Sequence, residues 1–219
     1  MSARKKYTFI DLFSGCGGLS EGFYRMGFTA LAHVEINHWA CETLRKRMRY
    51  YGYKNIEKEV VEKDITSEDI LAEIDKAVSG RIVDVIIGGP PCQAYSILGR
   101  AIKSAKDREL APEDIMEDPR NFLYKMYCRF LKKYHPAMFV FENVPGILSA
   151  GNGKYFKNIQ TYLHRLGYET EAKELNSSEY GVLQNRKRII IVGWLHGTGH
   201  TYPDLEKVEH NYKVKDLFC

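Results

Sequence analysis

Short apolar segments alternate with amphipathic segments of helical period along most of the chain, and this alternation constrains the fold more than any other sequence feature. The apolar segments predict strands at 7–13, 28–36, 82–87, 137–144 and 188–194, with a weaker strand at 56–61. The periodic segments predict helices at 18–27, 38–52, 121–134 and 153–167, and one at 67–78 that is capped by Thr66 or Ser67. Alternation of this kind predicts an α/β fold: a doubly wound, mostly parallel, Rossmann-like sheet with helices on both faces.

The length and composition are those of a single soluble domain. The chain has 219 residues, 44% hydrophobic and 27% charged, and no apolar run approaches the roughly 20 residues of a membrane helix. The N-terminus lacks the apolar stretch of a secretion signal, so we expect an intracellular protein. The five cysteines are Cys16, Cys41, Cys92, Cys128 and Cys219. They form no Cys-x-x-Cys pair and no Cys/His cluster, so we expect no disulfide framework and no metal, and we interpret Cys41 and Cys128 as core or helix residues.

One cysteine directly follows a predicted strand. In "DVIIGGPPCQAYSILGR", residues 84–100, an apolar segment runs into two glycines and two prolines and then into Cys92. In open α/β sheets, ligands bind at the edge formed by the carboxyl ends of the parallel strands. Cys92 is therefore a candidate nucleophile, because a cysteine thiolate needs only modest activation to react. A buried structural thiol is the alternative for Cys92 taken alone.

The connection after Cys92 is long and basic. It extends to about residue 121, whereas roughly 4–6 residues are typical of a compact domain. We interpret it as a mobile lid that grips phosphates, with plain disorder as the alternative. Its basic residues are Arg100, Lys103, Lys106 and Arg108. The net charge of +4 does not by itself indicate nucleic-acid binding, and we interpret the basic run at 45–49 as a solvated helix face.

A glycine-rich stretch and two later acidic residues form a candidate cofactor site. "DLFSGCGGLSEGF" follows the first strand and opens a helix, so its glycines bring backbone amides close to a ligand. The spacing Gly15-x-Gly17-x-x-Ser20 matches a dinucleotide fingerprint only in part. Glu35 lies about 20 residues further on, where it can bind ribose hydroxyls, and Asp64 can reach an adenine amino group or serve as an ordinary turn residue. The pattern indicates a nucleoside-containing cofactor and leaves both NAD and S-adenosylmethionine open.

Two arginines share one side of the last predicted strand. In "QNRKR", Arg186 and Arg188 point together and Lys187 points away, because alternate residues of an extended segment face the same way. The two guanidinium groups can supply positive potential near Cys92. An edge strand protected by charges is the alternative interpretation.

Four stretches, in this order and spacing, resemble the motifs of the cytosine-C5 DNA methyltransferase family: "DLFSGCGG", "GGPPCQAYS", "FENVPG" and "QNRKRIIIVG". The resemblance runs from about Tyr7 to Trp194 and implies the S-adenosylmethionine-dependent methyltransferase fold, with S-adenosylmethionine as cofactor, S-adenosylhomocysteine as its product and no metal. It implies that a cytosine is flipped out of duplex DNA and that Cys92 attacks its C6 atom. An NAD-dependent oxidoreductase would leave Cys92 and the two arginines without a role.

The same resemblance assigns roles to individual residues. It implies that Glu142 binds and protonates cytosine at N3, that Arg188 contacts O2 and that Arg186 supports the catalytic site. Asn143, Pro145 and Gly146 are expected to shape the turn after Glu142. The residues expected around the cofactor are Phe13, Gly15, Gly17, Gly18, Glu35, Ile36, Asp64, Ile65, Pro91 and Leu123. Those expected at the nucleic acid are Gln93, Ser96, Arg100 and Lys103.

The family pattern continues into a target-recognition region and a last motif, for which residues 196–219 show no equivalent. We expect a catalytic and cofactor-binding domain at 1–195 and a tail at 196–219, with recognition supplied by a second subunit or lost by truncation. The expected function is DNA cytosine-C5 methylation in a bacterial restriction-modification system, in the cytoplasm and associated with the nucleoid through DNA. The alternatives are a tRNA cytosine-C5 methyltransferase and an inactive fragment that needs a partner.

Overall fold

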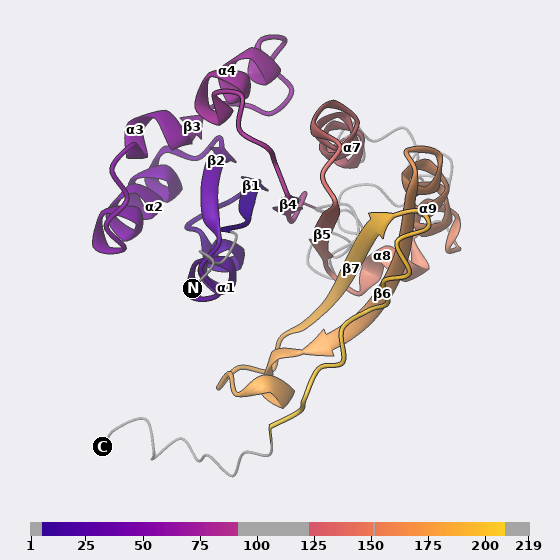
Figure 1. Ribbon diagram of the computed structural model, residues 1–219. Coiled ribbons are helices and arrows are strands. Elements are labelled where there is room, and N and C mark those ends of the chain that lie inside the picture. Colours follow the sequence, from indigo (N-terminus) through magenta and orange to yellow (C-terminus); the bar gives the residue numbers. More distant parts are fainter. Residues whose placement is uncertain (1–5, 92–122, 151, 209–219) are drawn as a thin grey trace, which may run out of the picture.

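The computed structural model describes residues 6–91, 123–150 and 152–208, which form one sheet flanked by helices (Figure 1). The elements in chain order are β1 (Thr8–Leu12), α1 (Gly18–Arg25), β2 (Thr29–Glu35), α2 (His38–Tyr50), α3 (Ile56–Glu59), β3 (Val60–Glu62), α4 (Ile70–Val78), β4 (Val85–Gly88), α7 (Leu123–Tyr134), β5 (Met138–Asn143), α8 (Gly146–Ser149), α9 (Lys154–Arg165), β6 (Tyr168–Asn176), the 3-10 helix η2 (Ser177–Tyr180) and β7 (Lys187–Leu195).

The sheet confirms the predicted doubly wound α/β fold. Its strand order within the described residues is β3-β2-β1-β4-β5-β7-β6. Strands β3, β2, β1, β4 and β5 pair in parallel, whereas β7 is antiparallel to β5 and β6 is antiparallel to β7. The carboxyl ends of β1, β2, β3, β4 and β5 therefore meet at one edge of the sheet, where ligands bind in folds of this class.

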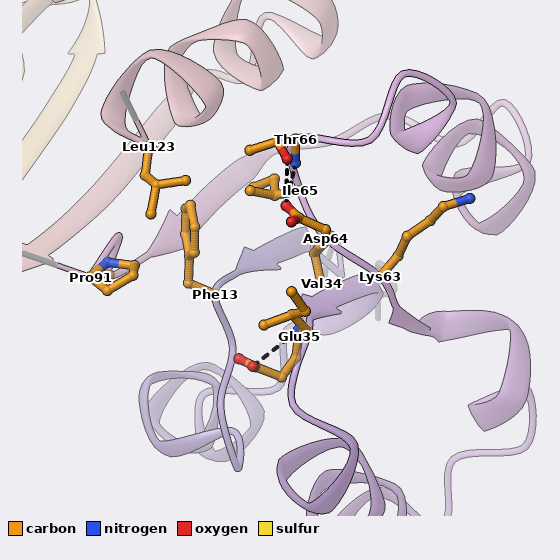
Figure 2. A pocket seen from close by; sticks show the side chains of 11 residues that line it. Phe13, Val34, Glu35, Lys63, Asp64, Ile65, Thr66, Pro91 and Leu123 are labelled. Atoms are coloured by element: carbon orange, nitrogen blue, oxygen red, sulfur yellow. Dashed lines mark hydrogen bonds between the residues drawn. The ribbon is translucent and has the colours of Figure 1, made fainter. Parts of the chain in front are cut away.

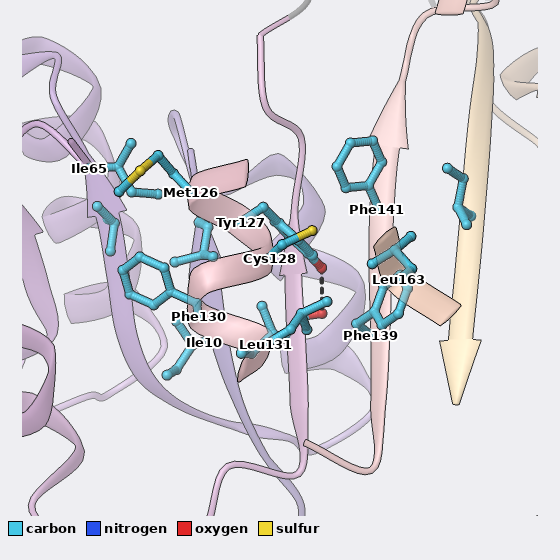
Figure 3. Close-up of a cluster of buried hydrophobic side chains, with 14 of the residues drawn as sticks. Ile10, Ile65, Met126, Tyr127, Cys128, Phe130, Leu131, Phe139, Phe141 and Leu163 are labelled. Carbon is cyan, nitrogen blue, oxygen red and sulfur yellow. Dashed lines mark hydrogen bonds between the residues drawn. The ribbon is translucent and has the colours of Figure 1, made fainter. Parts of the chain in front are cut away.

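Alternate residues of the strands pack against different helices. Ile10 and Phe139 belong to a large buried cluster with side chains of α4, α7, α8 and α9 (Figure 3). Phe9 and Val85 belong to a smaller cluster with α1 on the other side of the sheet. The Tyr127 hydroxyl of α7 lies 3.0 Å from the carbonyl of Ile86 and 3.1 Å from that of Val140, so it tethers the helix to β4 and β5. These contacts hold the strand ends rigidly enough to carry a site.

The structure differs from the sequence-based expectations in four points of local structure. The weak strand expected at 56–61 is split into α3 and the short strand β3. The N-cap of α4 is Asp69, not Thr66 or Ser67, and the Thr66 hydroxyl donates to Oδ1 of Asp64. Strand β6 was not expected, because it is an edge strand whose charged side chains are largely exposed and produce no apolar run. Its presence places β7 inside the sheet, so the interpretation of "QNRKR" as a charged edge strand is also wrong.

The segment after β7 folds back onto the sheet. Tyr202 is buried with Trp194 and Val192, and its backbone amide donates to Oε1 of Glu171 in β6 at 3.3 Å. Tyr202 thus packs against the strands, and the domain boundary expected near residue 195 remains a prediction. Among the described helices, none is long and apolar enough to cross a membrane.

Candidate active site

A cavity of about 410 Å³ opens at the carboxyl ends of β1, β2 and β3, beside the segments that follow β4 and begin α7 (Figure 2). Cavities of this size hold nucleoside-sized ligands. Phe13, Pro91 and Leu123 form an apolar side, whereas Glu35 and Asp64 supply carboxylates. The lining residues are Phe13, Val34, Glu35, Ile36, Lys63, Asp64, Ile65, Thr66, Gly89, Pro91 and Leu123.

Glu35 ends β2 with its carboxylate held by backbone amides. Oε2 accepts from the amide of Gly15 at 2.8 Å, and Oε1 accepts from the amides of Ile36 and Asn37 at 3.0 and 2.8 Å. A carboxylate has about four acceptor positions, so one remains for a ligand after these three bonds. Glu35 therefore links the glycine-rich loop to the cavity and can also accept from a ligand hydroxyl.

Asp64 is a turn residue that also lines the cavity, and the adenine-binding role expected for it remains a prediction. Its Oδ1 accepts from the backbone amide and the hydroxyl of Thr66, both at 2.8 Å, which makes it a turn residue. It also lines the cavity. Because both of these bonds use Oδ1, the second carboxylate oxygen is left, among the described residues, to accept from a donor inside the cavity.

The glycine-rich loop has left-handed backbone at three positions. Phe13, Gly15 and Gly17 have φ angles of 59°, 51° and 80°. A Cβ atom on Gly17 would lie 2.7 Å from Cδ1 of Leu44 in α2, so a side chain here would have to displace the buried Leu44 and would also strain the left-handed backbone. Gly15, Gly17 and the first residue of α1, Gly18, do not line the cavity. Their place is in the turn that carries Phe13 and the Gly15 amide to the cavity and to Glu35.

Glu142 lies near the end of β5 and is paired with an arginine of β7. Nε of Arg188 donates to Oε1 of Glu142 at 2.7 Å, and Nη2 of Arg186 lies 4.0 Å from the same oxygen. Lys187 instead pairs with Glu174 of β6 at 3.2 Å. The two arginines thus approach the same carboxylate, as their alternation in sequence predicts. The Glu142 side chain is 27% exposed, so a ligand can reach it.

The segment after β4 is packed against the end of β5. Nδ2 of the buried Asn143 donates to the carbonyl of Pro90 at 3.2 Å, and its Oδ1 accepts from the amide of Val144 at 2.9 Å. A Cβ atom on Gly89 would lie 2.7 Å from Oε2 of Glu142. The "GGPP" segment therefore reaches the carboxylate of Glu142 because its second glycine has no side chain.

Sequence reasoning did not identify Val34, Lys63, Thr66 and Gly89 as site residues. Val34 adjoins Glu35, Lys63 adjoins Asp64 and Thr66 adjoins Ile65 in the sequence. Their positions next to predicted site residues could therefore have indicated that they line the site. Gly89 follows the last residue of β4, and two consecutive glycines at a strand end indicate close approach of another group.

Five predicted site residues lie outside the described residues, so their roles remain predictions: Cys92, Gln93, Ser96, Arg100 and Lys103.

Among the described cysteines, Cys41 and Cys128 are buried as expected. Burial raises the pKa of Cys41 to about 11 and that of Cys128 to about 12, so both thiols stay protonated at neutral pH. The described residues contain no group of three His, Cys, Asp or Glu side chains able to hold a metal ion.

Comparisons with known proteins show which proteins this chain is similar to. The family model of C-5 cytosine-specific DNA methylases matches residues 7–217. The chain is 33% identical to the Type II methyltransferase M.Bpa9945I of Bacillus paralicheniformis, covering 90% of this chain and 56% of that protein. It is 38% identical to the Type II methyltransferase M1.HphI of Haemophilus parahaemolyticus, covering 93% and 50% respectively. The chain thus spans about half the length of these two relatives.

The fold is also shared with a solved structure. The Entamoeba histolytica methyltransferase EhMeth superposes with a TM-score of 0.65 at 21% sequence identity, over 94% of this chain and 58% of that one. At this level of identity the similarity shows the fold alone.

Proposed function

The chain belongs to the C-5 cytosine-specific DNA methylase family, and from this premise we propose that it carries the catalytic and cofactor-binding part of a DNA cytosine-C5 methyltransferase. The proposed reaction moves a methyl group from S-adenosylmethionine to C5 of a cytosine in duplex DNA. The observation that carries the proposal is the pairing of Glu142 with Arg188 beside Gly89, at the sheet edge that also holds the cavity.

The cavity suits S-adenosylmethionine by the chemistry of its lining. Glu35 has acceptor capacity for ribose hydroxyls, and the second carboxylate oxygen of Asp64 can accept from an adenine amino group. Phe13, Ile65 and Leu123 offer apolar surface for the flat adenine ring. Bound S-adenosylmethionine supplies an electrophilic methyl group. Gly15 and Gly17 would act through the loop that Glu35 anchors.

The chemistry at the cytosine needs a nucleophile and a group that stabilises the charged ring. We assign the first role to Cys92, whose thiolate would form a bond to C6 and push electrons toward C5. Glu142 would hold and protonate N3, which places the developing negative charge in a hydrogen bond. After C5 is methylated, loss of the C5 proton returns electrons to the ring and breaks the bond between C6 and the Cys92 sulfur. Arg188, already bound to Glu142, would orient that carboxylate and contact the cytosine O2.

The substrate reaches these groups by leaving the DNA stack. C5 and C6 of a stacked cytosine are not accessible to side chains at a sheet edge, so the base must be flipped. We assign phosphate and base contacts to Gln93, Ser96, Arg100 and Lys103, because a basic segment next to the nucleophile can grip the DNA backbone. We propose a restriction-modification context in the bacterial cytoplasm, with the enzyme held at the nucleoid through DNA. A further polypeptide that supplies target recognition is part of the same proposal.

The test is transfer of labelled methyl groups from S-adenosylmethionine to mixed-sequence duplex DNA by the full chain, with tRNA as a competing substrate. Label on DNA is expected, and it should disappear in Cys92→Ala. Glu174→Gln is a matched control, because Glu174 pairs with Lys187 on the neighbouring hairpin strand and lies outside the proposed chemistry. Label on tRNA in preference to DNA would overturn the proposed substrate.

A second experiment reports on the covalent step. Duplex DNA that contains 5-fluorocytosine should form an adduct that persists in denaturant, since fluorine cannot leave C5 as a proton does. The adduct should require both S-adenosylmethionine and Cys92. Tight binding of S-adenosylmethionine without transfer or adduct, even when a recognition region from a relative is added, would contradict the proposed activity.

A further inference from the structure

Helix α2 reaches the glycine-rich loop through Arg47. Nη1 of Arg47 donates to the backbone carbonyl of Cys16 at 2.7 Å, and Nη2 pairs with Oε2 of Glu21 in α1 at 2.5 Å. The side chains of Arg47 and Glu21 are 31% and 22% exposed, so this bridge is partly shielded from solvent. The basic run at 45–49, interpreted from sequence as a solvated face, therefore contains one side chain that contacts the loop.

The loop is a segment that needs such contacts. Gly15 and Gly17 both have left-handed backbone, and glycine loses more conformational freedom on ordering than any other residue. The amide of Gly15 is held by Glu35, and the amide of Gly17 donates to the carbonyl of Ser14 at 2.8 Å. Arg47 holds the carbonyl of Cys16, which lies between these two amides in the chain. The loop is thus fixed from β2 by Glu35 and from α2 by Arg47.

Glu21 keeps the guanidinium of Arg47 in place. Its carboxylate also accepts from the Tyr51 hydroxyl and from Nε of Arg25. The hydrogen bonds from Tyr51, Arg25 and Arg47 lower the pKa of Glu21 to about 2, so it is ionised at neutral pH. Since Glu21 is on α1 and Arg47 on α2, the bridge joins both helices to the turn between β1 and α1.

We propose that Arg47 is a positioning residue for S-adenosylmethionine: it pre-orders the loop at Cys16 and so strengthens cofactor binding without contacting the cofactor. Arg47 does not line the cavity, whereas Phe13 of the same loop does. A loop that is already ordered loses less entropy when a ligand binds, and this difference appears as affinity. The inference rests on the proposed function, because it takes the cavity to be the S-adenosylmethionine site.

Arg49 provides a matched control on the same helix. It carries the same charge, pairs with Glu57 at 2.9 Å, and its side chain is 54% exposed. Within the described residues, Arg49 bonds to Glu57 and not to the loop. Arg47→Gln and Arg49→Gln therefore change net charge equally and differ in the loss of the loop contact.

The first measurement is the affinity of the full chain for S-adenosylmethionine by titration calorimetry. Arg47→Gln should weaken binding roughly ten-fold, as expected for loss of a charge-assisted contact, and Arg49→Gln should stay within about two-fold of wild type. The affinity of Arg47→Lys should fall between those of the two glutamine variants. A lysine can reach the carbonyl of Cys16 or the carboxylate of Glu21, but it cannot donate to both at once as the two Nη atoms of arginine do. Equal affinities for Arg47→Gln and Arg49→Gln would overturn the proposal.

Hydrogen exchange of residues 14–18 without cofactor separates the two proposals. Arg47→Gln should speed exchange of this segment relative to Arg49→Gln, while exchange in β4 and β5 stays unchanged. If wild type does not bind S-adenosylmethionine, the proposed function fails, yet the exchange result still supports or contradicts the ordering by Arg47. Unchanged exchange in 14–18 would refute that ordering, and a general acceleration across the sheet would show a merely structural role.

Discussion

Arg188 meets Glu142 diagonally across the antiparallel pair of β5 and β7, with Nε of the arginine 2.7 Å from Oε1 of the glutamate. Glu142 is directly opposite Ile190, so Arg188 lies two residues away on the same face of the sheet. This register places a cation on the carboxylate that the proposed mechanism uses. It also explains why Arg186, a further two residues along, approaches the same oxygen.

Replacing Glu142 tests its proposed role at N3 directly. Glu142→Gln keeps the size of the side chain but removes the acid and the charge partner of Arg188, so we expect kcat for methyl transfer to fall roughly 10²–10⁴-fold. The KM for S-adenosylmethionine should change little, because Glu142 does not line the cavity. Lys187→Gln, on the opposite side of β7, should retain activity in the same assay. A Glu142→Gln enzyme with normal kcat would exclude Glu142 from the chemistry.

Adding a methyl group at Gly89 should disturb the same carboxylate. The new Cβ would lie 2.7 Å from Oε2 of Glu142, so Gly89→Ala should move the side chain and lower kcat by about ten-fold or more. Gly22→Ala in α1 is the control, because its added Cβ would meet no described atom within 4 Å beyond its chain neighbours and the nearby backbone of its own helix. That variant should stabilise the protein by about 0.5–1 kcal/mol in urea unfolding. If both glycine variants retain full activity, the close approach at Gly89 has no catalytic importance.

Asn143→Asp should destabilise the fold. The aspartate cannot donate to the carbonyl of Pro90, and the buried position leaves that carbonyl facing a carboxylate, so we expect a loss of about 1–3 kcal/mol. Asn176→Asp keeps its acceptor role toward the amide of Arg186 at 3.1 Å and should stay within about 0.5 kcal/mol of wild type. Equilibrium unfolding in urea measures both. Equal stability of the two variants would show that the bond from Asn143 to Pro90 contributes little.

Two buried groups in the first βαβ unit predict opposing pH dependences. Burial raises the pKa of Asp11 to about 7, with Ser20 donating to its carboxylate, and burial lowers the pKa of His33 to about 3. The raised pKa of Asp11 gives stability that is present below about pH 4 and lost as the pH rises toward 7. The lowered pKa of His33 gives stability that is present above about pH 6.5 and lost as the pH falls toward 3.

These slopes offset each other between about pH 4 and 6.5 in the wild-type protein. Relative to wild type, Asp11→Asn should lose stability as the pH falls through this range, and His33→Gln should lose stability as the pH rises through it. Each slope can reach about 1.4 kcal/mol per pH unit when the group titrates fully in one state alone. Urea unfolding at several pH values measures the two slopes. Parallel pH profiles for both variants and wild type would show that neither group titrates differently on folding.

Part of this site follows from local sequence alone. The apolar runs at 28–36 and 137–144 end near Glu35 and Glu142, and strands of a parallel sheet share one carboxyl edge, so both residues could be placed at that edge from the sequence. The alternation of Arg186 and Arg188 around Lys187 likewise set which side each takes, because the period of an extended strand is two.

The remaining relationships depend on which elements are neighbours, and only the tertiary structure decided them. The bond from Arg47 to Cys16, the approach of Gly89 to Glu142 and the bond from Asn143 to Pro90 join segments separated by more than 30 residues. Strand β6 was not predicted for a related reason. Pairing with β7 holds it at the sheet edge, and its own residues are too polar to show the apolar pattern of a strand. Local periodicity reports burial and direction along one segment, whereas the packing of distant segments is a property of the whole chain.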